Sequence, residues 1–278
     1  MSQPKNQATA PLVVEPEAAN SLIGKENILF IDLCQADSYV KHHVPGAIYL
    51  DYNWIVTADK PRMGLLPDIE QLSRILNAYG INEQTHIIAY DDEGGGRACR
   101  FLWTLQCIGH QPFSLLNGGI QAWAAEGYPM EQELNFPQAA NELHRALKYI
   151  EAPVADKQYI LDHLNDEAIV ILDTRSAQEY NGIKVFAARG GHIPGAVNYD
   201  WTRAMDKNNN LKLKDAEELK SDLAALGITP DKTIVCHCQS HHRSAHTCLM
   251  LNSIGFEKVK GYPGSWSDWG NDTSTPVE

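Results

Sequence analysis

The feature that most constrains the fold of this chain is an internal repeat. A turn around His43, with the letters HHVPGA, returns 149 residues later as GHIPGA around His192. Three further blocks recur in the same order, pairing Asp32 with Asp173 at a spacing of 141 residues, Asp91 with Cys238 at 147, and Trp123 with Trp266 at 143. Four matches in one order indicate two copies of a single structural unit.

The repeat divides the 278 residues into two domains, in agreement with a prior of about 150 residues per domain. We expect a first domain over residues 1–129, a polar linker over 130–147 and a second domain over 148–278. Because the spacing grows from 141 to 149 residues, the second copy is expected to carry about eight extra residues near Asn181–Gly190.

Each copy alternates apolar strands with helices, which predicts an α/β fold with a mostly parallel central sheet flanked by helices on both faces. The tail after Gly270 is expected to be loose. The expected buried strands are 28–31, 86–90, 169–172 and 233–237, with short strands at 12–14 and 148–150. The expected helices are 69–79, 98–108, 216–226 and 245–254.

The charge balance excludes two classes of partner. The chain has 35 acidic and 23 basic residues, a formal net charge of −12, which argues against binding to nucleic acid or to an anionic membrane. No stretch approaches the roughly 20 apolar residues of a membrane span, and the N-terminus lacks the apolar core of a signal peptide. We therefore expect a cytoplasmic protein whose six cysteines are free thiols.

Ligands bind at the carboxyl ends of the strands in open parallel sheets, so the loop after the second buried strand of each copy is the candidate site. The first loop, Asp91–Gly96, holds three carboxylates and no base. The second, Cys238–Arg243, holds two histidines, an arginine and no carboxylate. A cysteine between a buried strand and a helix N-terminus meets unpaired amides and a partial positive charge, which lower the pKa of a thiol. Cys238 is therefore the predicted nucleophile, and Arg243 is the cation expected to bind an oxyanion.

Three other interpretations fit parts of this loop. The cysteines and histidines between 236 and 242 are potential zinc ligands, but their spacing matches no familiar zinc pattern, so no metal site is expected. A cysteine phosphatase needs five residues between its cysteine and arginine, and this loop has four. A binding module without catalysis is the third, and the first copy fits it because Asp91 replaces the cysteine. Cys236 is assigned to the core, and His237 is expected to be a satisfied structural histidine.

The repeated blocks closely resemble the tandem-domain rhodaneses, the thiosulfate and 3-mercaptopyruvate sulfurtransferases, over residues 12–270. The N-terminal family signature resembles Tyr39–Ala47, and the C-terminal signature resembles Tyr262–Trp269, where Asp268 replaces the usual glutamate. The loop Cys238–Arg243 is similar to the Cys-Gln-Thr-His-His-Arg loop of a bacterial thiosulfate sulfurtransferase branch.

The resemblance implies that only the second copy is catalytic and that its site lies between the two domains. Cys238 would take a sulfane sulfur from thiosulfate or a similar donor as a persulfide and pass it to cyanide or a thiol, with no cofactor and no metal. A sulfur-accepting protein is a further candidate partner, whereas nucleic acid and membranes are not. The expected substrate-binding residues are Gln239, Ser240, His241, His242 and Arg243.

Two departures from the family bear on the donor. Mercaptopyruvate enzymes typically carry a Cys-Gly-Ser/Ala-Gly-Val-Thr loop, which this chain lacks. Many members also have a substrate-binding arginine where this chain has Glu179. Both departures favour thiosulfate, while a 3-mercaptopyruvate sulfurtransferase and a cysteine phosphatase stay as alternatives.

Several residues that recur in both copies are expected to be structural. The histidines of the two Pro-Gly turns, His43 and His192, are expected to cap backbone groups. Trp54 and Trp201 are expected either to wall an apolar pocket around the persulfide or to pack in the core. Three charged residues at strand ends are expected to tie loops together: Asp32, Asp173 and Arg175.

Overall fold

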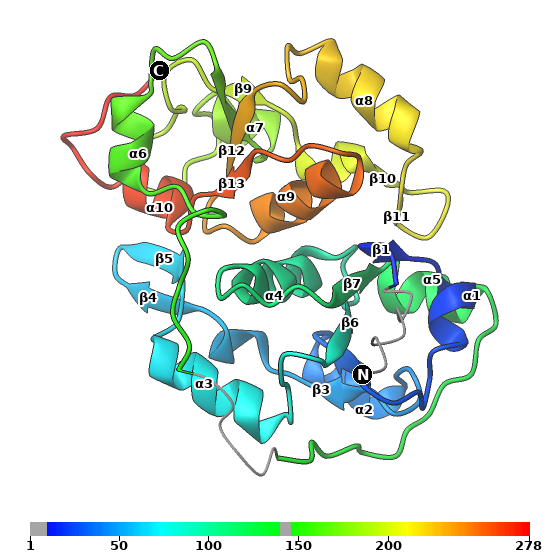
Figure 1. Cartoon of the computed structure of the whole chain (residues 1–278). Helices are drawn as coiled ribbons and strands as arrows, with labels where there is room; N and C mark the ends of the chain where they lie inside the picture. Colours follow the sequence, from blue (N-terminus) through cyan, green and yellow to red (C-terminus); the bar gives the residue numbers. More distant parts are fainter. Residues whose placement is uncertain (1–9, 140–145) are drawn as a thin grey trace, which may run out of the picture.

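The computed structural model describes residues 10–139 and 146–278. Figure 1 shows two units, each built around its own sheet, with residues 130–139 running along the outside of the first. The first sheet has the strand order β1-β7-β6-β2-β3, and all its pairings are parallel. These strands are β1 (Val13–Val14), β2 (Ile28–Asp32), β3 (Ile48–Tyr49), β6 (His86–Tyr90) and β7 (Phe113–Leu116).

Helices cover both faces of this sheet because its strands are apolar on both sides. On β2, Ile31 packs with α3 and α4, whereas its neighbour Phe30 packs with α1 and α5. An antiparallel hairpin, β4 (Thr57–Asp59) and β5 (Arg62–Leu65), extends from the unit. The helices are α1 (Pro16–Asn20), α2 (Ala36–Lys41), the 3-10 turn η1 (Tyr52–Trp54), α3 (Ile69–Ala78), α4 (Gly96–Gln106) and α5 (Gly119–Ala125).

The second unit repeats this plan with the parallel order β13-β12-β8-β9. On β12, Cys236 faces the cluster shared with α9, whereas Val235 faces α6 and α10. Its strands are β8 (Ile169–Asp173), β9 (Val197–Asn198), β12 (Thr233–His237) and β13 (Val259–Gly261), with an antiparallel pair β10 (Met205–Asp206) and β11 (Lys212–Leu213). Its helices are α6 (Lys157–Asp162), α7 (Ala177–Tyr180), η2 (Trp201–Ala204), α8 (Ala216–Ala224), α9 (Arg243–Ser253) and α10 (Ser265–Trp269).

The two units pack against each other through α4 and α9, which face each other at the centre of Figure 1. A single hydrophobic cluster runs across this contact and includes Phe101 and Leu105 from α4 with Leu249 from α9. No helix in the described part of the chain is long and apolar enough to cross a membrane.

The α/β class and the four predicted buried strands are confirmed. The helices predicted at 98–108 and 245–254 begin two residues earlier, at Gly96 and Arg243, because the preceding loops curl directly into the first helical turn. This earlier start places the first helical amides beside the residue that opens each loop.

The predicted strand at 148–150 is wrong. In its place, Val154 makes one isolated parallel bridge to Gly261. Pro153 has no N–H to extend the ladder, and only its carbonyl accepts a bond, from the Gly261 amide at 2.9 Å. The amide of Ile150 instead bonds to the Cys107 carbonyl of the first unit at 2.8 Å. Part of the predicted linker, residues 140–145, lies outside the described residues.

The tail after Gly270 is packed, contrary to the expectation that it is loose. The guanidinium of Arg189 bonds to the Thr275 carbonyl at 2.7 Å, and Trp269 Nε1 donates to the Pro276 carbonyl at 2.7 Å. His192 and Glu278 exchange two backbone hydrogen bonds of 2.8 and 3.0 Å. The half-buried Arg189 therefore organises the tail by donating hydrogen bonds to its carbonyl groups.

Candidate active site

The loop of the second copy lies between β12 and α9, against the first unit. Cys238 is 1% exposed, and its backbone is held by α10: its N–H donates to Ser265 Oγ at 3.3 Å, and its carbonyl accepts the Trp266 amide at 2.9 Å. His241 adopts the left-handed conformation with φ of 54°, which turns the chain sharply into the helix. The resemblance correctly placed this loop between the two units.

The surroundings of Cys238 favour its thiolate. Burial by itself raises the pKa of the thiol. Arg243, the Ser244 hydroxyl and the amides of Ser244 and Ser240 lower the pKa by more than burial raises it, so its value is about 7. The other cysteines with a resolved shift move the opposite way, because burial raises the pKa of Cys34, Cys99, Cys107 and Cys248. The chemistry expected of a nucleophile is therefore concentrated at Cys238.

Arg243 is held by a carboxylate. Its two terminal nitrogens donate to the two oxygens of Glu179 at 2.7 and 2.8 Å. Glu179 is buried, caps α7 in a reciprocal pair with Ser176, and has its pKa lowered to about 2 because Arg243 and Ser176 outweigh the effect of burial. The Cys238 thiolate also raises the pKa of Arg243, and Arg243 lowers that of Cys238. Arg243 therefore links Glu179 to the sulfur, and its charge is largely compensated.

The other loop residues point in different directions. His242 Nε2 donates to Glu93 Oε1 of the first copy at 2.5 Å. The His241 ring bonds to Ser244 Oγ at 2.8 Å. Gln239 Nε2 donates to the Phe186 carbonyl at 3.3 Å. The side chains of the two histidines are thus directed into the contact between the units, and the loop offers its Ser240 amide to Cys238.

Cys236 and His237, the two residues that precede the loop, are fully buried. Cys236 lies in the core, as expected. His237 lies 3.6 Å from Asp173, and burial lowers its pKa to about 4, so it is neutral at pH 7. Its Nε2 has no hydrogen-bond partner among the described residues, so the expectation of a fully satisfied histidine is wrong for that atom.

The matching loop of the first copy is filled by its own side chain. The Asp91 carboxylate accepts the amides of Glu93, Gly95, Arg97 and Ala98 at 2.7 to 3.0 Å. Burial and Glu93 raise the pKa of Asp91, and the amide bonds oppose that rise. The loop is therefore an anion cradle that already contains an anionic group.

The residues expected to be structural behave as such. His43 and His192 bond through Nδ1 to the carbonyls of Tyr39 and Tyr180 at 2.7 and 3.0 Å. Asp32 Oδ1 accepts the Cys34 amide at 2.7 Å. In the second copy, the Asp173 carboxylate binds the Arg175 guanidinium, which also donates to the Gly191 carbonyl at 2.8 Å.

The two tryptophans differ. Trp54 is 50% exposed, so it does not pack in the core. The Trp201 ring lies 5.3 Å from the ring of His246 and 6.1 Å from that of His242, beside the loop. Of the two tryptophans, Trp201 is the one that lies beside the Cys238–Arg243 loop.

Sequence reasoning missed the groups that hold the loop. Ser244 could have been found, because it follows Arg243 at the helix N-terminus, where a hydroxyl bonds readily to a neighbouring anion. Ser265 and Gly64 carry no local signal, since they reach the loop only through the tertiary fold. A β-carbon on Gly64 would overlap the Ser240 carbonyl, so β5 packs directly on the loop.

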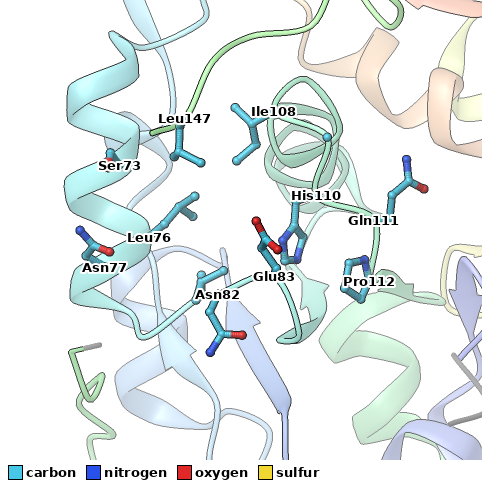
Figure 2. A pocket seen from close by; sticks show the side chains of 12 residues that line it. Ser73, Leu76, Asn77, Asn82, Glu83, Ile108, His110, Gln111, Pro112 and Leu147 are labelled. Carbon is cyan, nitrogen blue, oxygen red and sulfur yellow. The ribbon is translucent and has the colours of Figure 1, made fainter. Parts of the chain in front are cut away.

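Pockets elsewhere do not involve the loop. Figure 2 shows one of about 280 Å³ between α3 and the segment after α4, with Leu76, Ile108 and His110 among its lining residues. The His110 ring there already bonds to the Thr85 carbonyl at 3.1 Å. Within residues 10–139 and 146–278, no group of three or more His, Cys, Asp or Glu side chains is arranged to hold a metal ion.

Comparison with known proteins agrees with this geometry. The family model described as "Rhodanese-like domain" matches residues 15–126 and 156–272. A thiosulfate sulfurtransferase of Azotobacter vinelandii is 44% identical over 98% of both chains, and one of Pseudomonas aeruginosa is 39% identical over 96% of this chain and 97% of its own. The sulfur carrier protein TtuD of Thermus thermophilus is 32% identical over 86% of both.

A solved structure shares the fold. The anaerobic ergothioneine biosynthesis enzyme of Chlorobium limicola superposes with a TM-score of 0.85 at 22% identity, over 96% of this chain and 70% of that one.

Proposed function

The chain belongs to the rhodanese family and is a sulfurtransferase; from that premise we propose that thiosulfate is its donor and that the sulfur is carried as a persulfide on Cys238. The observation that carries the proposal is the Cys238 thiol, which is buried yet has a pKa of about 7 because Arg243, Ser244 and the Ser240 amide offset the burial. An appreciable fraction of the thiol is therefore ionised near neutral pH.

In the first step, the Cys238 thiolate attacks the outer sulfur of thiosulfate. The bond between the two sulfurs of thiosulfate breaks, its electron pair leaves with sulfite, and the enzyme retains a persulfide anion. The loop amides that face Cys238 stabilise this anion as they stabilise the thiolate. We assign donor binding to the loop Gln239–Arg243, with the N–H groups of Arg243 not used by Glu179 directed at the sulfonate end.

In the second step, cyanide or a thiolate attacks the outer sulfur of the persulfide. The Cys238 thiolate is the leaving group, and thiocyanate or a new persulfide departs. No cofactor or metal enters either step as written, since every electron pair comes from a sulfur or carbon nucleophile.

Glu179 supports thiosulfate over 3-mercaptopyruvate. Glu179 stands where many members of the family carry a substrate-binding arginine, so the cation that would bind a ketoacid carboxylate is replaced here by a carboxylate paired with Arg243. The alternative of a phosphatase is weaker, because the loop is one residue too short and the relatives are sulfurtransferases.

We propose that residues 1–129 form a non-catalytic domain, that 130–147 link it, and that 148–278 form the catalytic domain. A cytoplasmic location is supported by six cysteines that are all free thiols.

We also propose that a protein thiol can accept the sulfur. The extra segment of the second copy exposes Ile183 (75%) and Phe186 (56%) beside the loop, where the Phe186 carbonyl meets Gln239. The Lys184 ammonium lies 5.0 Å from the centre of the Phe186 ring, so an acidic acceptor protein is the fitting partner. Phe186→Ser should slow transfer to such a protein and leave transfer to cyanide unchanged; equal effects on both would reject this surface.

Donor profiling tests the proposed reaction. Purified enzyme and Cys238→Ala are assayed for thiocyanate formation with thiosulfate and with 3-mercaptopyruvate. We expect thiosulfate to be the better donor and Cys238→Ala to be inactive with both. Preference for 3-mercaptopyruvate would replace the proposed donor, and activity in Cys238→Ala would reject the mechanism.

A further inference from the structure

A buried arginine of the first copy has no acidic partner. Arg100, on α4, is 0% exposed. Its terminal nitrogens donate to the carbonyls of Gly64 and Leu65 at 2.7 and 3.1 Å, and Nε lies 3.5 Å from Thr104 Oγ1. No carboxylate in the described part of the chain forms an ion pair with it. Burying a guanidinium without a counter-ion is costly, so its presence at this position points to a role beyond packing.

The groups that contact Arg100 also contact the catalytic loop. Gly64, whose carbonyl it binds, packs directly on the Ser240 carbonyl. The guanidinium lies 5.2 Å from the Trp103 ring, and that ring lies 4.1 Å from the ring of His241. Arg100 is therefore one layer behind the loop, on the side formed by the first copy.

The neighbouring guanidinium groups are compensated. Arg243 is paired with Glu179, and Arg97, one turn before Arg100 on α4, is paired with Asp92 and Glu93. A loop that must hold a thiolate, a persulfide and an anionic donor thus gains little net charge from its own arginine.

We propose that Arg100 of the non-catalytic copy is a positioning residue that supplies the uncompensated positive charge behind the Cys238 loop and fixes the loop through Gly64. The inference rests on the proposed role of Cys238. It gives the copy that lost the nucleophile a part in the reaction.

Two observations support this direction of action. Burial lowers the pKa of Arg100, and the charges of Tyr52, Cys107 and, after them, Cys238 oppose that fall, so the sulfur of the second copy is among the groups that act on this guanidinium. The repeat spacing of 147 pairs Arg100 with Thr247, a neutral residue. The positive charge of Arg100 therefore acts from the first copy on the second, and the equivalent position of the second copy carries no charge.

The other titratable side chains around Cys238 allow the titration of its thiol to be followed. Arg243 and Glu179 keep their charges near neutral pH, since the pKa of Arg243 is raised by Glu179 despite burial and that of Glu179 is about 2. Burial lowers the pKa of His237 to about 4, lowers that of His241 further, and raises that of Tyr52 to about 12. His242, paired with Glu93, is present unchanged in every variant compared.

The test measures alkylation of Cys238 by iodoacetamide from about pH 5 to about pH 10, scored on the Cys238 peptide by mass spectrometry. Arg100→Met and the less disruptive Arg100→Gln should raise the apparent pKa by roughly 0.5 to 1 pH unit. Alkylation near pH 7 then slows about two- to fivefold, whereas the rate near pH 10 is unchanged. Arg100→Lys keeps the charge and should restore most of the shift. Arg62→Met is the matched control. Arg62 lies on the β4–β5 hairpin that Arg100 contacts, and its charge is already compensated by Asp59.

The outcomes separate charge from packing. Folded neutral variants with an unchanged Cys238 pKa would overturn the proposal. So would failure of both neutral variants to fold, since Arg100 would then serve stability alone. Alkylation of Cys238 does not depend on sulfur transfer. If the wild-type enzyme forms no persulfide, the proposed function is rejected, but the comparison of the Cys238 pKa between variants is still valid.

Discussion

The two loops at the ends of β6 and β12 have the same place in the fold and opposite chemistry. In the first, the Asp91 carboxylate occupies the cradle formed by four backbone amides. In the second, the Cys238 thiol meets amides, a hydroxyl and a guanidinium that lower its pKa to about 7. Backbone amides thus act on the residue that opens the loop in both copies, and that residue is a carboxylate in the first and a thiol with a lowered pKa in the second.

The difference extends to the charges around each loop. The first loop adds Asp92 and Glu93, and its Arg97 pairs with both. The second has no carboxylate of its own, and Glu179 reaches it from α7. The acidic net charge of the chain is thus not concentrated at the Cys238 loop, which holds no carboxylate of its own, although its Arg243 is compensated by Glu179.

The largest expected effect comes from moving the nucleophile to the first loop. We expect the double variant Asp91→Cys, Cys238→Ala to be at least about 10³-fold slower than wild type in thiocyanate formation. The introduced thiol would have amides around it, but Asp92 and Glu93 would disfavour its thiolate. Cys238→Ala alone is the control, and transfer above its level would mean that the cradle suffices without the local charge.

The next effect concerns the stability of the first loop. Asp91→Ala leaves four amides without their acceptor, so we expect the free energy of unfolding to fall by about 2–4 kcal/mol in urea denaturation. Asp91→Asn, which keeps one carbonyl acceptor, should lose less. A loss below about 1 kcal/mol for the alanine variant would show that the carboxylate is not what holds this loop.

The Glu179–Arg243 pair should make the second copy sensitive to acid. The folded pKa of Glu179 is about 2, below its ordinary 4.5, so its contribution to stability is full above about pH 4.5 and is lost as the pH falls toward 2. We expect Glu179→Gln to lose about 1–3 kcal/mol at pH 7. Unfolding measured between pH 7 and about pH 3 should show the two proteins converging; a constant gap would contradict the ion-pair account.

The smallest effect is expected where the two loops touch. Glu93→Gln removes the charge that accepts the His242 hydrogen bond, and both side chains are partly solvated. We expect a loss of about 0.5–1 kcal/mol in the free energy of unfolding, reduced further by salt. A loss of several kcal/mol would make this contact a main support of the interface.

The fold was largely readable from the sequence because periodic, fully apolar strands and a repeat leave few arrangements. The strands at 86–90 and 233–237 match the structure at both ends. The misses come from contacts with distant residues. The amide of Ile150, in the predicted strand at 148–150, bonds to Cys107 of the first unit, and Arg189, more than 80 residues away, organises the tail. A long-range hydrogen-bond network of this kind leaves no local pattern.

The site was readable only where its chemistry is local. Cys238 and Arg243 stand in one short loop, so their types and spacing could be interpreted directly. The pairing of Arg243 with Glu179, 64 residues earlier, reverses the picture of a free cation and could not be seen in the loop. The same holds for Arg100, whose relation to Cys238 exists only because α4 packs on α9.

The central claim is that sulfur is carried on Cys238 and not on the first copy. The most direct measurement incubates wild-type enzyme with thiosulfate, removes the donor, and maps the mass gained peptide by peptide without reductant. We predict one added sulfur on the peptide containing Cys238, lost again on addition of cyanide. Absence of the adduct, or its presence on any of the other five cysteines, would contradict the account.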